Sequence, residues 1–213
     1  MARACVFLGA AFGAIRLESG SRGDLYNCVI RDCHWGVYRI SNVAITLTNC
    51  TLVANGVAVL DADQIGQAVR LTNCVVRDNT LAFGGNQSIV ATYSNIQGGW
   101  PGEGNIDADA QFVDPDGADD IPENEDDDYR LLPASPCIDA GDVDAPAGAF
   151  DVNGAPRVVD HPGHFNAGGW PAAIDMGAYE TPAPACTADL DGDGSVGIAD
   201  LSILLTVYGT MCP

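Results

Sequence analysis

Apolar residues return at a fixed interval through the first half of the chain. The interval is marked by cysteines spaced 23, 22 and 24 residues apart, namely Cys5, Cys28, Cys50 and Cys74. Three of them lie in nearly identical phrases, L-Y-N-C-V-I at 25–30, L-T-N-C-T-L at 47–52 and L-T-N-C-V-V at 71–76, and A-T-Y-S-N-I at 91–96 is a weaker copy. A period of this length predicts stacked structural units that bury their apolar side chains against one another.

Each copy predicts short β-strands, because Val, Ile, Leu and Thr are interrupted by Gly, Asn and Asp and no helical period competes. Leu47 and Cys50 have opposite parity, so both point inward only if the chain bends between them. Asn tolerates the left-handed backbone of such a bend, and the expected corners are Asn27, Asn49 and Asn73. A second corner is expected five residues after each cysteine, at Cys33, Asn55 and Asn79. The next strand carries apolar residues at Trp35/Val37, Val57/Val59 and Leu81/Phe83.

The first residues keep the register of the repeat. The segment 5–13 aligns with the segment that starts at the second cysteine, so that Phe7 and Phe12 take the positions of Ile30 and Trp35. A basic start followed by apolar residues is also typical of a signal peptide, but a signal peptide has no reason to keep this register. We therefore expect a first coil here, and a chain that starts within the repeat rather than at an atypical cap, so that further coils would precede it in a longer protein.

The period and the N-C-x-[ILV] phrase resemble those of right-handed parallel β-helix proteins, over about residues 3–97. The resemblance implies an all-β fold in which about 4–5 coils wind right-handedly around a dry interior. Adjacent coils would lie ~4.8 Å apart. On this reading the repeated cysteines are buried as small apolar residues, and Cys33 and Cys137 have no obvious partner.

The net charge of −20 is concentrated in the second half of the chain. Residues 1–100 hold seven Arg and six acids, residues 101–213 hold two Arg and 23 acids, and Lys is absent. This balance argues against nucleic acid and anionic membrane surfaces as partners, because binding to either needs cationic side chains. No apolar run reaches the ~20 residues of a membrane span. Cations are the expected partners of the second half.

The densest acidic stretch is 114–128, with nine carboxylates. A solvated loop held open by self-repulsion is one interpretation. A low-affinity calcium site is the other, since Ca²⁺ takes six to eight oxygen ligands. The spacing within the stretch matches no defined ligand pattern.

Four phrases around and after this stretch occur in a characteristic order: Y-S-N-I-Q-G-G-W at 93–100, Y-R-L-L-P-A-S-P-C-I-D-A-G-D at 129–142, D-V-N-G-A-P-R at 151–157 and D-M-G-A-Y-E at 175–180. They resemble the conserved tail of bacterial surface β-helix proteins known as the choice-of-anchor Q domain. The resemblance implies a secreted or surface protein with a C-terminal sorting device, and no reaction. We expect residues 98–182 to form loops and short strands that pack on the last coil and close its open end.

Residues 189–200 read D-L-D-G-D-G-S-V-G-I-A-D and have the spacing of a calcium loop. Gly194 provides the sharp turn, and a water would fill the vertex at Gly197. The predicted ligands are Asp189, Asp191, Asp193, the backbone carbonyl of Ser195, and Asp200. In the L-S-I-L-L-T-V-Y segment that follows, one helical face carries Leu201, Leu204, Leu205 and Tyr208.

This loop, with Asp at its last position and no helix before it, resembles one half of a type I dockerin and is EF-hand-like. Dockerins carry two such repeats, and this chain carries one over residues 183–213, as in the C-terminal tails of planctomycete-type secreted proteins. Cys186 and Cys212 flank the loop and its helix, and a disulfide between them would close a loop of about 25 residues and add ~3 kcal/mol. The resemblance and the cysteines indicate an extracellular or cell-surface location.

An enzyme is the competing interpretation, because many β-helices are polysaccharide lyases or glycoside hydrolases. A glycosidase needs two carboxylates at a defined separation. Among the acids of the repeat, Asp61 and Asp63 are placed for this role, and Asp32 and Asp78 occupy equivalent positions two coils apart, roughly 10 Å. Arg31 and Arg77 precede the latter two. These four residues are weak catalytic candidates, and a solvated Arg/Asp face is the interpretation that we prefer for them.

From the sequence we expect a secreted or surface-displayed bacterial β-helix protein with a structural or adhesive role. Extracellular polysaccharide or an anchoring partner at the cell surface would be its ligand, and Ca²⁺ its metal. The alternative is a carbohydrate-active enzyme whose catalytic coils are partly missing. H-P-G-H at 161–164 could hold a metal, but a polar loop is the simpler interpretation. Trp100 and Trp170 could stack on sugars, but aromatic residues in such loops more often fix the loop on a core.

Overall fold

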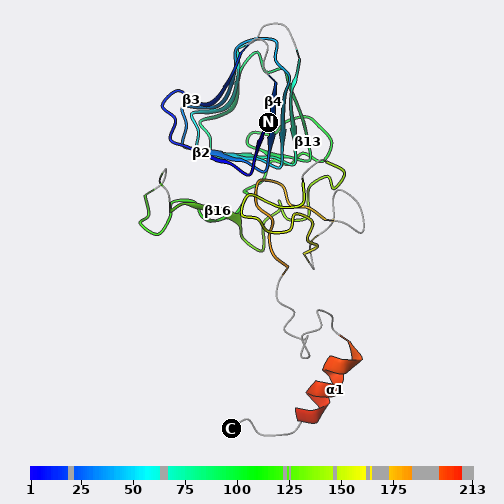
Figure 1. Cartoon of the computed structure of the whole chain (residues 1–213). Helices are drawn as coiled ribbons and strands as arrows, with labels where there is room; N and C mark the ends of the chain where they lie inside the picture. Colours follow the sequence, from blue (N-terminus) through cyan, green and yellow to red (C-terminus); the bar gives the residue numbers. More distant parts are fainter. Residues whose placement is uncertain are drawn as a thin grey trace. The chain divides into compact units, whose positions relative to one another are not determined.

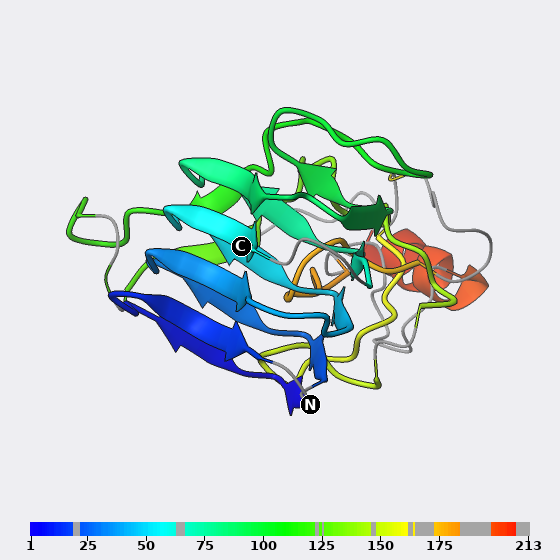
Figure 2. The same ribbon diagram turned by 90° about the horizontal axis from the view of Figure 1, so that it is seen from above.

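The computed structural model describes residues 1–18, 22–62, 67–121, 124, 126–145, 148–161, 164, 173–183 and 197–207. By its contacts the chain divides into two compact units, Met1–Pro182 and Ala183–Pro213. The first unit begins with a parallel β-solenoid of about four turns, followed by a segment with little regular structure. Figure 1 views the coils nearly end-on, and Figure 2 shows them stacked from the first to the last.

Each of the first four coils contributes one strand to each of three parallel sheets, and the last copy adds strands to two of them. Sheet 1 contains β1 (Ala2–Arg3), β4 (Gly23–Tyr26), β7 (Ile45–Thr48), β10 (Val69–Thr72) and β13 (Ile89–Thr92). Sheet 2 contains β2 (Val6–Leu8), β5 (Val29–Arg31), β8 (Thr51–Val53), β11 (Val75–Arg77) and β14 (Asn95–Ile96). Sheet 3 contains β3 (Gly13–Leu17), β6 (Trp35–Arg39), β9 (Val57–Asp61) and β12 (Leu81–Gly85). This arrangement confirms the predicted parallel β-solenoid.

The corners between sheets 1 and 2 are the predicted asparagines. Asn27, Asn49 and Asn73 have φ values of 52°, 50° and 54°, and Ala4 and Tyr93 take the same conformation in the first and last copies. At the second corner the left-handed residue lies one position earlier than predicted, at Asp32, Ala54 and Asp78. The predicted residues Asn55 and Asn79 follow it and turn their side chains inward.

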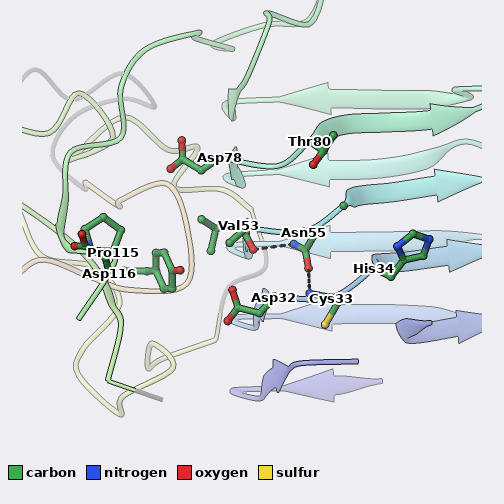
Figure 3. A pocket seen from close by; sticks show the side chains of 12 residues that line it. Asp32, Cys33, His34, Val53, Asn55, Asp78, Thr80, Pro115 and Asp116 are labelled. Carbon is green, nitrogen blue, oxygen red and sulfur yellow. Dashed lines mark hydrogen bonds between the residues drawn. The ribbon is translucent and has the colours of Figure 1, made fainter. Parts of the chain in front are cut away.

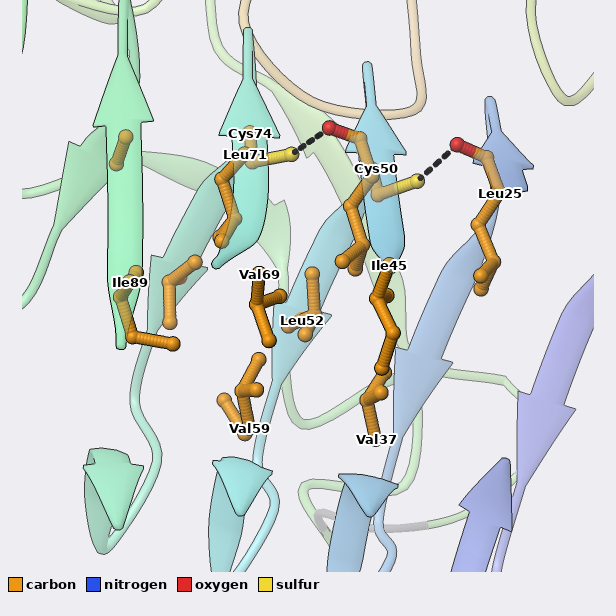
Figure 4. Packing of buried hydrophobic residues seen from close by; sticks show 14 of the residues in the cluster. Leu25, Val37, Ile45, Cys50, Leu52, Val59, Val69, Leu71, Cys74 and Ile89 are labelled. Carbon is orange, nitrogen blue, oxygen red and sulfur yellow. Dashed lines mark hydrogen bonds between the residues drawn. The ribbon is translucent and has the colours of Figure 1, made fainter. Parts of the chain in front are cut away.

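The interior is a set of columns of like residues, as the repeat predicts (Figure 4). Leu25, Leu47 and Leu71 are paired in register, and so are Ile30, Leu52 and Val76; all are at most 2% exposed. Cys28, Cys50 and Cys74 form a third column with 0% exposure. The Cys50 thiol donates to the backbone oxygen of Leu25 at 3.7 Å, and the Cys74 thiol to that of Leu47 at 3.6 Å. All three are free thiols, as predicted, and burial raises the pKa of Cys50.

The first nine residues pair with the second coil, which confirms the predicted rung. Phe7 pairs with Ile30 as expected. The prediction for Phe12 is wrong, because Gly13 pairs with Trp35. Four residues separate β2 from β3 whereas three separate β5 from β6, so Phe12 is displaced into the longer corner and is 77% exposed.

The segment after β14 covers the solenoid in two ways. Residues 98–108 close the last coil, since Ile106 bridges Asn95 and the Trp100 ring packs on Phe83 at 4.8 Å. The described residues that follow, up to residue 182, contact the outer face of sheet 2 along several coils, which the sequence did not indicate. The apolar residues at this contact include Val53, Val75, Phe112, Tyr129, Cys137, Ile138 and Met176.

Two features fix this second segment, here called the tail (98–182), on sheet 2. β15 (Phe112–Asp114) and β16 (Asp128–Leu131) pair antiparallel as a hairpin. Farther along, Gly177 lies against Thr51, where a Cβ atom would stand 2.8 Å from the Thr51 hydroxyl, and the residue has a φ of 97°. The adjacent Ala178 amide donates to that hydroxyl at 2.9 Å. Close backbone approach therefore requires glycine here.

The second unit contains α1 (Ile198–Val207), which includes most of the predicted helical segment. The side chains predicted to share one helical face are exposed, with Leu201 at 54%, Leu204 at 51% and Leu205 at 61%. Tyr208 lies outside the described residues.

Candidate functional site

A cleft of about 770 Å³ lies between the second corner of the solenoid and the β15–β16 hairpin (Figure 3). One wall is formed by successive corners and carries Asp32, His34, Asn55, Asp78 and Thr80. The opposite wall comes from the tail, with Pro115, Asp116 and Tyr129. The volume lies within the ~300–1,000 Å³ typical of small-ligand sites. The structure thus places two of the four weak catalytic candidates, Asp32 and Asp78, in one cleft.

Asp32 is held by an ion pair. Arg31 Nη1 lies 2.8 Å from Asp32 Oδ2 and 2.9 Å from Asp127 Oδ2, and the side chains of the three residues are 6%, 2% and 0% exposed. The Arg31 guanidinium also lies over the Tyr129 ring, 5.5 Å from its centre. The prediction of a solvated Arg/Asp face is therefore wrong at this coil, because the hairpin covers it. Arg31, whose guanidinium also pairs with Asp32, docks the tail on the solenoid.

Asp78, the equivalent residue two coils on, is exposed to solvent. Partial desolvation raises its pKa, Arg77 opposes this, and Asp109 adds to it. Arg77 itself pairs with Asp107 of the tail at 2.6 Å. Both predicted arginines therefore form ion pairs with the tail, while Asp78 keeps an open carboxylate toward the cleft.

The hairpin supplies further acids, which belong to the acidic stretch 114–128 and which the sequence did not single out. Asp116 is exposed on the cleft wall. Desolvation and a hydrogen bond with Asp116 raise the pKa of Asp114, and the charges of Asp120 and Asp126 act in the same direction. Negative charge is thus crowded on this wall.

A buried amide ladder supports the solenoid wall of the cleft. Asn55 Oδ1 accepts the Cys33 amide at 3.1 Å, and Asn55 Nδ2 donates to Asn79 Oδ1 at 3.0 Å and to the Ile30 carbonyl at 3.0 Å. Asn79 Oδ1 also accepts the backbone amide of Asn55 at 2.9 Å. The backbone amide of Asn79 donates to Gln97 Oε1 at 3.1 Å. These bonds run from coil to coil and keep the corners in register.

Another of the candidate acids lies inside the solenoid. Asp61 forms a bidentate pair with Arg39, at 2.9 Å and 2.7 Å, and both side chains are 0% exposed. Arg39 also donates to the carbonyls of Val43 and Gln67. Asp61 is therefore a structural group of the core. Asp63 lies outside the described residues.

The characteristic phrases of the tail build a buried polar network. Arg157, with a fully buried side chain, donates through Nη2 to the carbonyls of Asp175 and Gly177, and its Nε lies 3.5 Å from Glu180 Oε2. Glu180 accepts the amides of Val159 and Asp175 at 3.2 Å each. Burial and the charge of Asp175 raise the pKa of Glu180 to about 9.

The other buried acids of the network also accept backbone amides. Asp175 binds the amides of Asp139 at 2.9 Å and Thr181 at 2.7 Å, and burial raises its pKa. Asp151 accepts the amides of Asn153, Ala155 and Glu180. The phrases 151–157 and 175–180 thus come together because their carboxylates replace the backbone partners that a regular sheet would supply.

The predicted metal ligands fall mostly outside the described residues. These are Asp189, Asp191, Asp193 and Ser195, together with the cysteines Cys186 and Cys212. Asp200 is described; it is 3% exposed, and its Oδ2 accepts the Gly197 amide at 2.6 Å at the start of α1. In the described part of the chain no group of three or more His, Cys, Asp or Glu side chains is arranged to hold a metal ion, which includes the described acids of 114–128.

The remaining candidates have structural contacts. Trp100 fixes its loop on the core, and Trp170 lies outside the described residues. The rings of His161 and His164 pack edge to face, with their centroids 4.8 Å apart. The backbone amide of His161 donates to Asp139 Oδ2 at 3.0 Å, and His164 Nε2 contacts the Pro133 carbonyl at 2.8 Å.

Comparisons of the chain with protein-family models, with curated proteins and with solved structures return no match. Among the described residues, no helix has the length and apolar character needed to cross a bilayer.

Proposed function

We propose that this chain is a structural or adhesive module of a secreted or cell-surface β-helix protein, and that it associates with polysaccharide. The proposal rests on the ion pairs that the charged side chains of the repeat form. The candidate catalytic arginines Arg31 and Arg77 form ion pairs that join the tail to the solenoid, and Asp32 is paired with Arg31. A cleft of ligand size remains beside them.

The finer features of the proposal rest on the sequence resemblances. We propose that the coils wind right-handedly, as parallel crossover connections nearly always do. The tail would correspond to a choice-of-anchor Q domain, and residues 183–213 to a single dockerin-like, EF-hand-like repeat for attachment or sorting. An extracellular or surface location follows from these resemblances.

Calcium binding by the second unit has its own test. Asp189, Asp191, Asp193, the Ser195 carbonyl and Asp200 would hold Ca²⁺. Calorimetry of the whole chain should show calcium binding that is lost in Asp189→Ala and kept in Asp144→Ala, which removes an exposed acid of the tail. An unchanged isotherm in Asp189→Ala would assign the metal to another site.

The enzymatic alternative is a polysaccharide lyase or glycoside hydrolase. Asp32 and Asp78 lie two coils apart, roughly 10 Å, slightly beyond the ~6.5–9.5 Å of an inverting pair. The whole chain should therefore release no new reducing ends or unsaturated products from acidic and neutral polysaccharides. Turnover that disappears in Asp78→Ala would replace the structural proposal with the enzymatic one.

A further inference from the structure

The cleft between the second corner and the hairpin is lined by more acidic than basic side chains. Its lining includes Asp32, Asp78 and Asp116, and among the described residues that form it there is no arginine, while the chain has no lysine. Arg31 lies next to it, but this guanidinium already faces two carboxylates, those of Asp32 and Asp127. The field in the cleft is therefore negative, and an anionic sugar such as a uronate would be repelled.

Two of these carboxylates are exposed and lie on opposite walls, and one of them, Asp116, is hydrogen-bonded to the Asp114 carboxyl. Asp78 projects from the solenoid corner and Asp116 from the tail, and both are exposed. Neither belongs to an ion pair of the described residues. Because the described residues offer no metal-holding group, a ligand that carries its own separated positive charges suits this pair better than a single metal ion.

The remaining lining suits a hydroxylated ligand. The exposed side chains of His34 and Thr80 supply hydrogen-bonding groups on the solenoid wall. These two residues occupy the same repeat position two coils apart, and Ala54 and Gly56 of the coil between them also line the cleft. The solenoid wall can therefore contact the hydroxyl groups of a saccharide at two positions.

From these observations we propose that the cleft binds a saccharide bearing protonated amino groups, with Asp78 and Asp116 as the groups that recognise them. The inference deepens the proposed association with polysaccharide and rests on it. It names the ligand class as amino sugars that are not acetylated, and it excludes uronic-acid polymers.

The test is calorimetry of the whole chain with a β-linked glucosamine tetramer at about pH 6, where ordinary carboxyl groups are ionised. The fully N-acetylated tetramer has the same backbone without the charges, and a galacturonate tetramer has the opposite charge. The glucosamine tetramer should bind, the acetylated one at least about tenfold more weakly, and the galacturonate one not measurably. Each charge pair at a partly exposed site contributes up to about fivefold in Kd.

The variants locate the site. Asp78→Asn and Asp116→Asn should each weaken glucosamine binding by up to about fivefold, while Asp144→Asn, an equal charge change outside the cleft, should leave it within about twofold. Thiol protection of Cys50 and Cys137 confirms that each variant is folded. Equal weakening by all three variants would overturn the inference by showing attraction to the general negative charge of the protein.

The outcomes separate this inference from the proposed function. If the acetylated tetramer binds as tightly as the glucosamine tetramer and Asp78→Asn weakens both, the cleft binds saccharide and the amino-sugar inference fails. Absence of binding by all three tetramers also overturns the inference, while the structural role stands. Cleavage of any tetramer would overturn the structural role itself.

Discussion

The solenoid and the tail satisfy their backbone amides with different hydrogen-bond acceptors. In the solenoid, backbone amides pair in parallel ladders and apolar columns fill the interior. In the tail, β15 and β16 are the regular strands of the described residues, and buried carboxylates of Asp139, Asp151, Asp175 and Glu180 accept the amides instead. A repeated sequence can stack on itself, whereas a single non-repeated segment needs side chains that bind specific backbone groups.

The comparison predicts that a substitution in one region opens that region more than the other. The reactivity of the buried thiols measures this opening. Cys28, Cys50 and Cys74 lie inside the solenoid, and Cys137 lies where the tail meets sheet 2. Burial raises the pKa of Cys137 to about 11, so this thiol reacts only when the tail opens. Labelling of each cysteine, followed by mass spectrometry, therefore measures the opening of each region separately.

The largest effect is expected from Arg157→Met. Removal of this cation leaves the carbonyls of Asp175 and Gly177 without their donor and takes the positive charge away from the buried Asp175 carboxylate, which costs ~3–5 kcal/mol. Labelling of Cys137 should rise far more than labelling of Cys50. Equal labelling of both cysteines would show that the two regions open as one.

Leu52→Ala tests the solenoid in the same way. Leu52 is 0% exposed between Ile30 and Val76, so its truncation leaves a cavity and costs ~2–5 kcal/mol. Labelling of Cys50 should increase markedly in a denaturant series. The matched control is Leu81→Ala, at a side chain that is 53% exposed, where the unfolding free energy should change by ~0.5 kcal/mol or less. A similar loss in both variants would contradict the stacked core.

Asn55→Ala probes the polar ladder of the second corner. The substitution leaves the Cys33 amide and the Ile30 carbonyl without their side-chain partner, which costs ~1–3 kcal/mol. Denaturant unfolding should detect this loss. Asn86→Ala, in the turn after β12, is the comparison variant and should lose less; an equal loss would mean that the ladder adds no specific stability.

The most specific effect is expected in the pH dependence of stability, from Glu180→Gln. Because the pKa of Glu180 is raised to about 9 in the folded protein, its contribution is full below the ordinary pKa of ~4.3 and is lost as the pH rises toward 9. Wild-type unfolding free energy should therefore fall with pH across this window, by up to ~1.4 kcal/mol per unit. The unfolding free energy of the Gln variant should fall less steeply with pH, and near pH 8 the variant should be at least as stable as the wild type. Parallel pH profiles would show that Glu180 is ionised in the native state.

The sequence predicted the solenoid well because its information is periodic. The asparagine corners, the strand register and the buried thiol column all follow from local phrases that repeat. The displacement of Phe12 was not predictable, since one extra residue in a corner is visible only once the strands are paired. The inward Arg39–Asp61 pair also escaped prediction, because charged residues are rarely expected in a core.

The candidate site was predicted only in part. Asp32 and Asp78 share a repeat position, so their alignment on one edge could be expected. Asp116 and Tyr129 reach the cleft from segments distant in the sequence, and no pattern indicated that the hairpin would lie beside the second corner. For the same reason Arg31 was expected on a solvated face, whereas it is covered by the tail.

The central claim is that the coils stack in parallel with like residues in register, and amide contacts measured by nuclear Overhauser spectroscopy on isotope-labelled protein test it most directly. The structure predicts contacts between the strands that hold Leu25, Leu47 and Leu71, and between those that hold Ile30, Leu52 and Val76. Antiparallel contacts between strands that follow each other in the chain, such as β7 and β8, with none between residues a full coil apart, would contradict the account.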